Sequence, residues 1–465
     1  MEEQGSSRLL MFEQQSIGKL MLKFSLPAII SMVVNSIYNI VDQIFIGWGV
    51  GYLGNAATNV AFPMMTVAMA LSTMICDGCV AYFSLKLGEK RYDEAARTMG
   101  NGVMIATVTG LIMFLLGEAF LSPLLKLCGA TENVFPYAVD YVSITLIGFP
   151  LVFIAMTISS LIRAEGNPRY AMICMLAGCI TNIILDALFV LVLGWGVKGA
   201  AWATVLGQFL NFILCIGYIP RFRDIQFRLE NMKPKKSVLG AFLPLGISSL
   251  FTQMSFAILQ VCMNNQLVKY GTLSIYGPDI PLAAFGIVMK VNSIIISVLV
   301  GISVGSQPIV GYNYGARNFG RVKKTYLRTI LVGSIVAILG WSCFQLFPQN
   351  IVNVFGQESE LYNEFAVKCF RRFLVTVCLA GVTVPTGIFF QSIGKPVIAM
   401  ISSMLRPLVF FIPSLYFFTS RLGIDGALLA GPFSDLLAFL LVATLAIIEM
   451  RKLTSAEQTV HNEAS

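Results

Sequence analysis

Hydrophobic residues in this chain form a dozen long runs separated by short polar segments. Each run is near the roughly 20 residues that span the hydrocarbon core of a bilayer as an α-helix. The runs lack the strict alternation of a membrane β-barrel, and backbone amides in lipid must bond within their own segment. We therefore predict twelve membrane-spanning helices, at residues 24–47, 57–85, 99–121, 136–162, 170–194, 200–219, 238–268, 282–310, 329–348, 363–391, 397–418 and 426–449.

The pattern of the first half is repeated in the second half. SLPAIISMVVNSI, from Ser25, aligns with FLPLGISSLFTQM, from Phe242, at an offset of 217 residues. LGEKRYDEAART near Gly88 aligns with YGARNFGRVKKT near Gly315 at 227, and AEGNP aligns with SIGKP at 228. Six spans per half give both copies the same orientation. We predict an all-α integral membrane protein of two six-helix lobes, related by a pseudo-twofold axis along the membrane normal.

Basic residues gather on one side of this topology. With the N-terminus in the cytoplasm, 23 Lys and Arg residues lie on that side and 7 on the other, as the positive-inside rule requires. The largest basic loop, Arg221 to Lys236, falls between the halves and is explained more simply by anionic lipid than by nucleic acid. The predicted parts are a cytoplasmic tail (1–23), a first lobe (24–219), a cytoplasmic linker (220–237), a second lobe (238–449) and a cytoplasmic tail (450–465).

Composition supports a plasma-membrane protein and excludes several kinds of chemistry. The chain is 56% apolar and only 12% charged, against roughly 25% charged in soluble domains. The single histidine, His461, lies in the polar tail, and the only close cysteine pair, Cys76 and Cys79, lies inside a predicted span. No P-loop and no cluster of metal ligands or catalytic groups occurs. We therefore expect neither an enzyme nor a cofactor or metal site, and we expect energy to come from an ion gradient.

Two carboxylates inside predicted spans are the strongest candidates for chemistry. An ionisable side chain in hydrocarbon costs at least about 2.5 kcal/mol, so each one needs a reason. Asn35, Tyr38 and Asp42 share one helix face, and Asn182 and Asp186 share another. Burial and a second negative charge both favour a protonated carboxyl, which a proton-coupled carrier needs. A structural role, in which amides and hydroxyls fix the two carboxylates, is the alternative.

Three sequence motifs resemble those of the multidrug and toxic-compound extrusion (MATE) family. They are GSQPIVGYNYGARNFGRVKK after the eighth span, IRAEGNPRYAM after the fourth, and LP near the start of each half. The resemblance covers essentially the whole chain and is greatest to the bacterial DinF-like and MepA-like branch. It implies export of amphipathic, often cationic compounds by proton or sodium antiport. The positions that match those implicated in that branch are Pro27, Asn35, Tyr38, Asp42, Asn182, Asp186 and Thr204.

The second half departs from the other bacterial branch of this family. That branch carries acidic residues in its seventh and tenth helices, whereas residues 242–268 and 373–391 contain none here. We therefore expect ion coupling in the first lobe, at Asp42 and Asp186. The Asn182 amide and the Thr204 hydroxyl would let the same oxygens bind sodium instead of a proton, and the sequence leaves both ions open.

Four further charged residues within predicted spans are secondary candidates. For Asp77 we favour a water-facing or paired structural role. Lys290, Arg406 and Asp435 lie in the second half, where a buried ion pair is the first interpretation. The alternative is that Lys290 or Asp435 faces the central cavity and tunes charge selectivity.

Two residues complete the candidate site. Pro27 shares a helix with Asp42 and removes one helix hydrogen bond, so it is a candidate hinge whose bending follows protonation. Met175 lies seven residues before Asn182 on the same face and is a candidate for lining a substrate cavity.

These features predict a secondary active antiporter. It would export amphipathic, preferentially cationic drugs or toxic compounds in exchange for protons or sodium by alternating access, in contact with membrane lipids and as a monomer. A flippase for lipid-linked precursors is the alternative. That function needs a cationic cavity for pyrophosphate, and only Lys290 and Arg406 are cationic deep in the spans.

Overall fold

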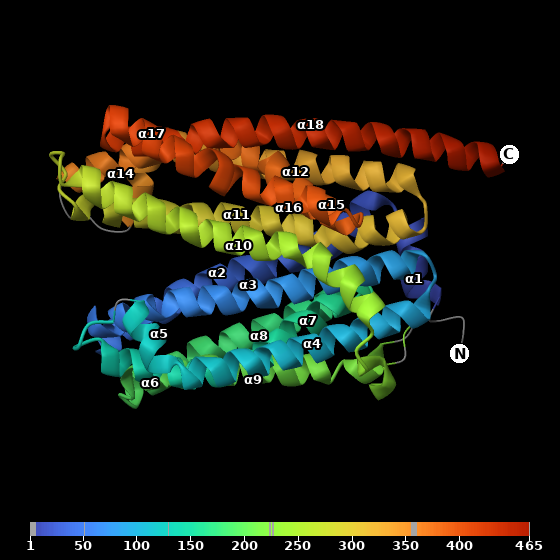
Figure 1. Ribbon diagram of the computed structural model, residues 1–465, viewed down its shortest axis with the longest axis horizontal. Coiled ribbons are helices and arrows are strands. Elements are labelled where there is room, and N and C mark those ends of the chain that lie inside the picture. The colour runs from blue at the N-terminus through green and yellow to red at the C-terminus, as the bar shows by residue number, and fades with distance from the viewer. Residues whose placement is uncertain are drawn as a thin grey trace.

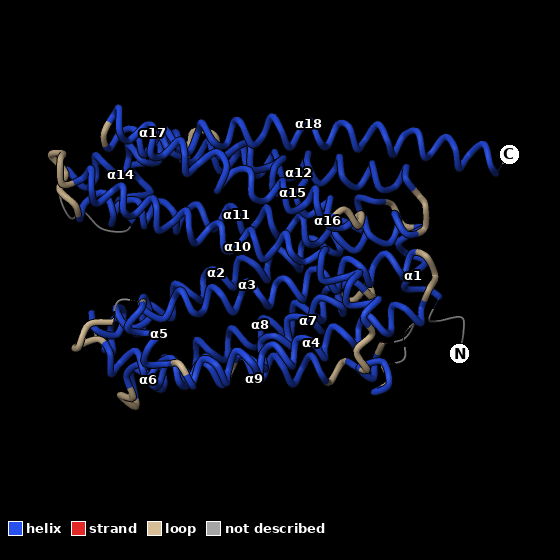
Figure 2. Tube along the Cα trace, in the orientation of Figure 1, coloured by secondary structure: helices blue, strands red, loops and turns tan. Residues whose placement is uncertain are grey.

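The computed structural model describes residues 6–50, 52–128, 130–222, 225, 227–354 and 360–464, and these residues form helices joined by turns and short loops (Figure 2). Ten of the described helices are long and apolar enough to cross a membrane, and two bent helix pairs raise the number to twelve. The prediction of an all-helical membrane protein is therefore confirmed. His461 lies in the last helix, α18.

The first lobe consists of α2 to α9, drawn in blue and green in Figure 1. Its elements are α2 (Ile17–Val50), α3 (Tyr52–Gly88), α4 (Tyr92–Ala119), α5 (Leu121–Leu127), α6 (Phe135–Ile147), α7 (Phe149–Ala164), α8 (Pro168–Asp186), the π-helix η1 (Ala187–Val192) and α9 (Gly196–Ile216). A short helix, α1 (Ser6–Gln14), precedes it, and the 3-10 turns η2 (Ile219–Arg221) and η3 (Leu229–Met232) follow it.

The second lobe consists of α10 to α18, drawn in yellow to red. Its elements are α10 (Lys236–Gly271), α11 (Asp279–Gly315), α12 (Phe319–Leu346), α13 (Pro348–Val354), α14 (Glu360–Phe373), η4 (Val377–Leu379), α15 (Ala380–Ser392), α16 (Pro396–Met404), the π-helix η5 (Leu405–Phe411), α17 (Ile412–Leu422) and α18 (Ile424–Ala464).

Two predicted spans are broken rather than continuous. The fourth is split into α6 and α7, and the tenth into α14 and the η4–α15 segment, each with a bend of 44°. At the first break, Gly148 precedes Pro150 at the second position of α7, where proline fits a helix start but not a helix interior. At the second break, the β-branched residues Val375 and Thr376 lead into a 3-10 turn.

The two lobes meet at one end of the molecule and diverge towards the other (Figure 1). We call the meeting end the linker end, because it carries the turns η2 and η3 and both described termini. A buried apolar cluster there combines residues of both lobes, such as Phe83 of α3, Phe242 of α10 and Ile309 of α11. Towards the far end the fully buried clusters separate, one belonging to the first lobe and one to the second.

Glycines bring the lobes into backbone contact at the linker end. A Cβ at Gly88 would lie 2.0 Å from Tyr312 O, and a Cβ at Gly315 would lie 2.1 Å from Leu85 O. The two contacts are equivalent, because the repeat offset of 227 residues relates Gly88 to Gly315 and Leu85 to Tyr312. Lys90 and Arg317, which take φ values of 59° and 58°, are related by the same offset. The seam between the lobes therefore has an approximate twofold axis.

The same relation holds deeper in the seam, where α3 packs on α10 and α11 packs on α2. A Cβ at Gly246 would lie 1.7 Å from Met74 O, and a Cβ at Gly301 would lie 2.6 Å from Ile29 Cα. Met74 and Gly301 differ by 227 residues, and Ile29 and Gly246 differ by 217. The two contacts are thus related by the repeat, although at this depth both glycines belong to the second lobe and lie against backbone of the first.

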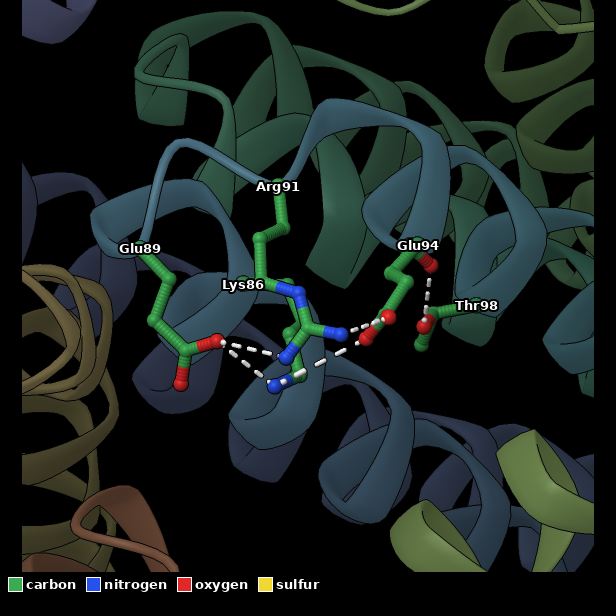
Figure 3. Close-up of polar contacts among 5 residues, drawn as sticks. All are labelled: Lys86, Glu89, Arg91, Glu94 and Thr98. Carbon is green, nitrogen blue, oxygen red and sulfur yellow. Dashed lines mark hydrogen bonds and ion pairs between the residues drawn. The ribbon is translucent and has the colours of Figure 1, made fainter.

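A group of charges fixes the turn between α3 and α4 at the linker end (Figure 3). Lys86 Nζ lies 2.7 Å from Glu89 Oε2 and 3.7 Å from Glu94 Oε2. Arg91 pairs with the same two glutamates. Because these charges pair with one another at the α3–α4 turn, far along the helices from Asp42 and Asp186, we assign this group to shaping the turn around Lys90 and not to ion coupling.

Candidate functional site

Two carboxyl groups from different helices meet inside the first lobe. Asp42 lies in α2 and Asp186 is the last residue of α8, and they are 7% and 0% exposed. Their side chains lie within hydrogen-bonding reach of each other, and one oxygen of each has no protein partner. Two carboxylates are both acceptors, so a bond between them requires a proton. The geometry therefore fits a carboxyl pair that shares one proton or holds one small cation.

Neighbouring polar groups hold this carboxyl pair in place. The Asn182 amide can be oriented with its nitrogen donating to Asp186 Oδ2 at 3.2 Å, while its oxygen accepts from the Thr204 hydroxyl and backbone amide at 3.2 Å. We adopt this orientation because it satisfies both ends of the amide. Gln43 hydrogen-bonds to Asp42 and accepts a hydrogen bond from Thr58 at 3.1 Å. Asp42, Asp186, Asn182 and Thr204 are thus brought together in the structure.

Two tyrosines extend the site. Tyr38 lies one helical turn before Asp42 in α2, within electrostatic range of both carboxyl groups. Tyr141, from α6, is also within range of Asp42, Asp186 and Tyr38. Tyr141 is not among the residues expected from the sequence, because nothing in a single sequence places the fourth span beside the first and fifth. Its polar ring inside an apolar run is the only signal that marks it.

The π-helix η1 begins directly after Asp186. A π-helical turn adds a residue to the turn, and such turns occur frequently at functional sites. Here it shifts the helix register next to the carboxyl pair. The sequence analysis treated this segment as a plain helix.

Three other predicted residues lie further from the carboxyl pair. Pro27 is buried in α2, 15 residues before Asp42 and so about 22 Å along the helix. It stands between Ser25 and Ile29, which both contact α11 in the seam. Met175 lies about 16 Å from Asp186 along α8. Asn35 is half-buried two turns from Asp42, and its carbonyl accepts from Asn39 Nδ2 at 2.6 Å.

The charged residues of the second lobe are paired only in part. Arg406 Nε donates to Asp435 Oδ1, and the other oxygen of Asp435 accepts from the Thr376 hydroxyl at 2.7 Å. Arg406 and Asp435 thus form the expected ion pair, but it is not fully buried, because the Arg406 side chain is 40% exposed. Lys290 is exposed and is not part of that pair.

Asp77 bonds across the seam between the lobes. Ser249 of α10 donates to Asp77 Oδ2 at 2.6 Å, and Gln391 Nε2 donates to Ser249 Oγ at 3.3 Å and to Leu245 O at 2.9 Å. Arg163 of α7 lies within electrostatic range of the Asp77 carboxylate. The expected paired role is thus present, but the hydrogen-bond partner belongs to the other lobe.

The architecture is that of a polytopic membrane transporter, with two lobes that meet at one end and a buried acidic site in one of them. The MatE family model matches residues 27–188 and 244–417, which is more than half of the chain. The chain therefore belongs to the MATE family of membrane transporters, and the resemblance seen in its motifs is confirmed.

Individual relatives extend this match over nearly the full length. "Multidrug export protein MepA" of Staphylococcus haemolyticus is 25% identical, with 90% of this chain and 91% of the relative covered. The MepA protein of a Staphylococcus aureus strain is 24% identical over the same shares. A MOP superfamily transporter from Pyrococcus furiosus has a TM-score of 0.89 at 22% identity, covering 96% of this chain and 98% of that chain. An outward-facing multidrug resistance MATE family transporter also has a TM-score of 0.89 at 22% identity, covering 95% and 98%.

Proposed function

We propose that this chain exports amphipathic organic compounds in exchange for protons, with Asp42 and Asp186 as the coupling groups. The observation that carries the proposal is the buried carboxyl pair, in which each acid has an oxygen without a protein partner. Export of drug-like compounds is further supported by the names of the MepA relatives.

The carboxyl pair is more stable with one bound proton than with both groups ionised. Two carboxylates within hydrogen-bonding reach repel each other unless one is protonated or a cation lies between them. Binding of a cationic substrate nearby would favour loss of that proton, and reprotonation would favour release of the substrate. This competition couples the two fluxes.

Sodium is the second candidate ion, favoured by one observation. In the other orientation of the Asn182 amide, its nitrogen donates to the Thr204 hydroxyl at 3.2 Å and its oxygen faces acceptors, so that this oxygen and the carboxyl oxygens form a ligand set of the kind that hard cations prefer.

We propose that the linker end faces the cytoplasm and that the two lobes move as units. The basic residues of the chain gather at this end, as the positive-inside rule requires of a cytoplasmic side. The lobes diverge at the opposite end (Figure 1), and under this proposal that end faces the outside. Export then requires the glycine contacts of the seam to separate while the far end closes.

Flipping of lipid-linked precursors is less consistent with the charges. A pyrophosphate needs several cations that are free to bind it. Arg406 is already paired with Asp435, and Arg163 lies beside Asp77. Lys290 alone offers too little positive charge for such a headgroup.

The test is dye efflux from proteoliposomes under separately imposed pH and sodium gradients. We expect a pH gradient to drive efflux by the unmodified protein, and Asp186→Asn and Asp42→Asn to abolish the driven component. Asp140→Asn is the matched control, because Asp140 forms an exposed pair with Lys198 and lies outside the site. Driven efflux at the normal rate by both site variants would refute the coupling assignment, and efflux driven only by sodium would replace the ion.

A further inference from the structure

One lysine in a membrane-spanning helix is exposed although it lies on a helix face that contacts the other lobe. Lys290 belongs to α11, and within the described part of the chain it has no ion-pair partner. An unpaired cation inside a span is costly and marks a functional position by default.

The face that carries Lys290 is the face that α11 presents to the first lobe. Seven residues, or two helical turns, separate Lys290 from Ser297, so both lie on one face. Ser297 Oγ lies 2.7 Å from Ser36 Oγ of α2, and Gly301 on the same side contacts Ile29. Beyond Ser297 this face is open, because a Cβ at Gly286 would meet no heavy atom within 4 Å. Lys290 therefore faces the opening between the lobes.

Lys290 lies at the depth of the carboxyl pair. From the Ser36–Ser297 bond, Lys290 is seven residues towards the far end on α11, and Asp42 is six residues towards the far end on α2. At 1.5 Å per residue, Lys290 is about 10.5 Å and Asp42 about 9 Å beyond that bond. The carboxyl pair buried inside the first lobe and the exposed cation of the second lobe thus lie at nearly the same level.

No carboxylate competes for Lys290 within the described residues. Asp435, an acid within a span of the same lobe, is already bound to Arg406 and Thr376. The polar side chain at the corresponding level of α2, Asn39, is exposed and neutral. Lys290 is therefore available to bind an anionic group on a molecule in the opening.

We propose that Lys290 is a specificity residue that binds the anionic group of zwitterionic amphipathic substrates. The carboxylate or sulfonate of such a compound contacts Lys290, while its ammonium group interacts with the acidic site of the first lobe. The inference rests on the proposed export function and narrows its substrate class. Compounds that carry only positive charge gain nothing from Lys290 and are repelled by it.

The test is direct binding, which needs no ion gradient and is therefore independent of transport. Tetramethylrhodamine and its methyl ester differ in one carboxylate, so the first is zwitterionic and the second cationic. Fluorescence anisotropy with the purified full-length protein in nanodiscs gives a Kd for each dye. We expect the unmodified protein to bind the zwitterion more tightly than the ester.

Lys290→Gln should weaken binding of the zwitterion about tenfold, as loss of a hydrogen bond between charged groups predicts, and should leave the ester unchanged or bound more tightly. Lys290→Arg should retain the preference, and Lys324→Gln, which removes an exposed charge in α12 at the linker end, should not alter it. Equal changes for both dyes in Lys290→Gln would overturn the inference, as would tighter binding of the ester by the unmodified protein. If the ratio of the two dyes' Kd values depends on Lys290 but the protein does not transport, the export proposal alone would be contradicted.

Discussion

Replacing Ser249 with alanine should shift the protein towards the conformation in which the linker end is open. Ser249 and Asp77 belong to different lobes, so their hydrogen bond exists only while the seam is closed. Gln391 donates to Ser249 Oγ, which leaves the serine proton directed at the Asp77 carboxylate. When the seam separates, water can replace Ser249 as the donor. The variant therefore loses stability in the closed seam alone.

The magnitude follows from the charge on Asp77. A hydrogen bond to a charged group contributes about 1.5 to 3 kcal/mol, and about 1.4 kcal/mol corresponds to a tenfold change in an equilibrium constant. We expect the ratio of open to closed seams to rise at least about tenfold. The matched control is Ser25→Ala, because Ser25 donates to Ile302 O, a neutral acceptor, across the related half of the seam at 3.2 Å. A neutral bond contributes about 0.5 to 1.5 kcal/mol, so its effect should be smaller.

Pulsed electron spin resonance measures this shift as a distance distribution. Labels at Asp93 and Lys324, which are exposed at the linker end of different lobes, can be attached through an unnatural amino acid, so that the ten cysteines stay in place. The long-distance population should grow in Ser249→Ala. An unchanged distribution, or a larger shift in Ser25→Ala, would refute the reasoning that the charged bond holds the seam.

Two further variants test how the lobes and the linker are held. Gly246→Ala places a Cβ 1.7 Å from Met74 O, so it should lower the melting temperature by several degrees. The control is Gly240→Ala, whose Cβ would meet no heavy atom within 4 Å and should leave the melting temperature unchanged. Equal melting temperatures for the two variants would contradict the close contact. Asn101→Ala removes three hydrogen bonds to linker residues 231, 233 and 235, so trypsin should cleave the linker faster. An unchanged cleavage rate would show that Asn101 does not anchor the linker.

The sequence predicted what depends on span length and polarity. The twelve hydrophobic runs match ten single helices and two bent pairs, because a helix that crosses lipid must be long and apolar. It also singled out Asp42, Asp186 and Asn182, which the structure brings together, since buried charge is rare in spans and each acid has polar neighbours at helical spacing, whereas Thr204 came from the family resemblance.

What the sequence could not supply depends on contacts between distant segments. The position of Tyr141 beside the carboxyl pair follows from packing of α6, and the Asp77–Ser249 bond joins residues 172 positions apart. Likewise, the hydrophobic pattern does not mark the bends near Gly148 and Thr376, although Pro150 and the β-branched residues stand there, and it does not mark the π-helix after Asp186. Periodicity reports which face of a helix is polar, but not which helix lies opposite.

The residues that follow the repeat and the charged residues that depart from it have separate roles. The backbone contacts of the seam follow the repeat, so the two halves meet in equivalent contacts that can separate together. The charged residues do not follow it. At the repeat offsets Asp42 corresponds to Leu259, Asp77 to Val304 and Lys290 to Pro63.

A symmetric seam gives the two lobes equivalent surfaces on which to rock. Only unequal groups can make one conformation respond to an ion or a substrate, because a ligand shifts an equilibrium solely by binding one state more tightly. Leu259→Asp places a carboxyl group in the second lobe at the position equivalent to Asp42. We therefore expect this variant to bind an additional proton without coupling that proton to export. Efflux whose proton stoichiometry doubles in that variant would show that the second lobe can couple as the first one does.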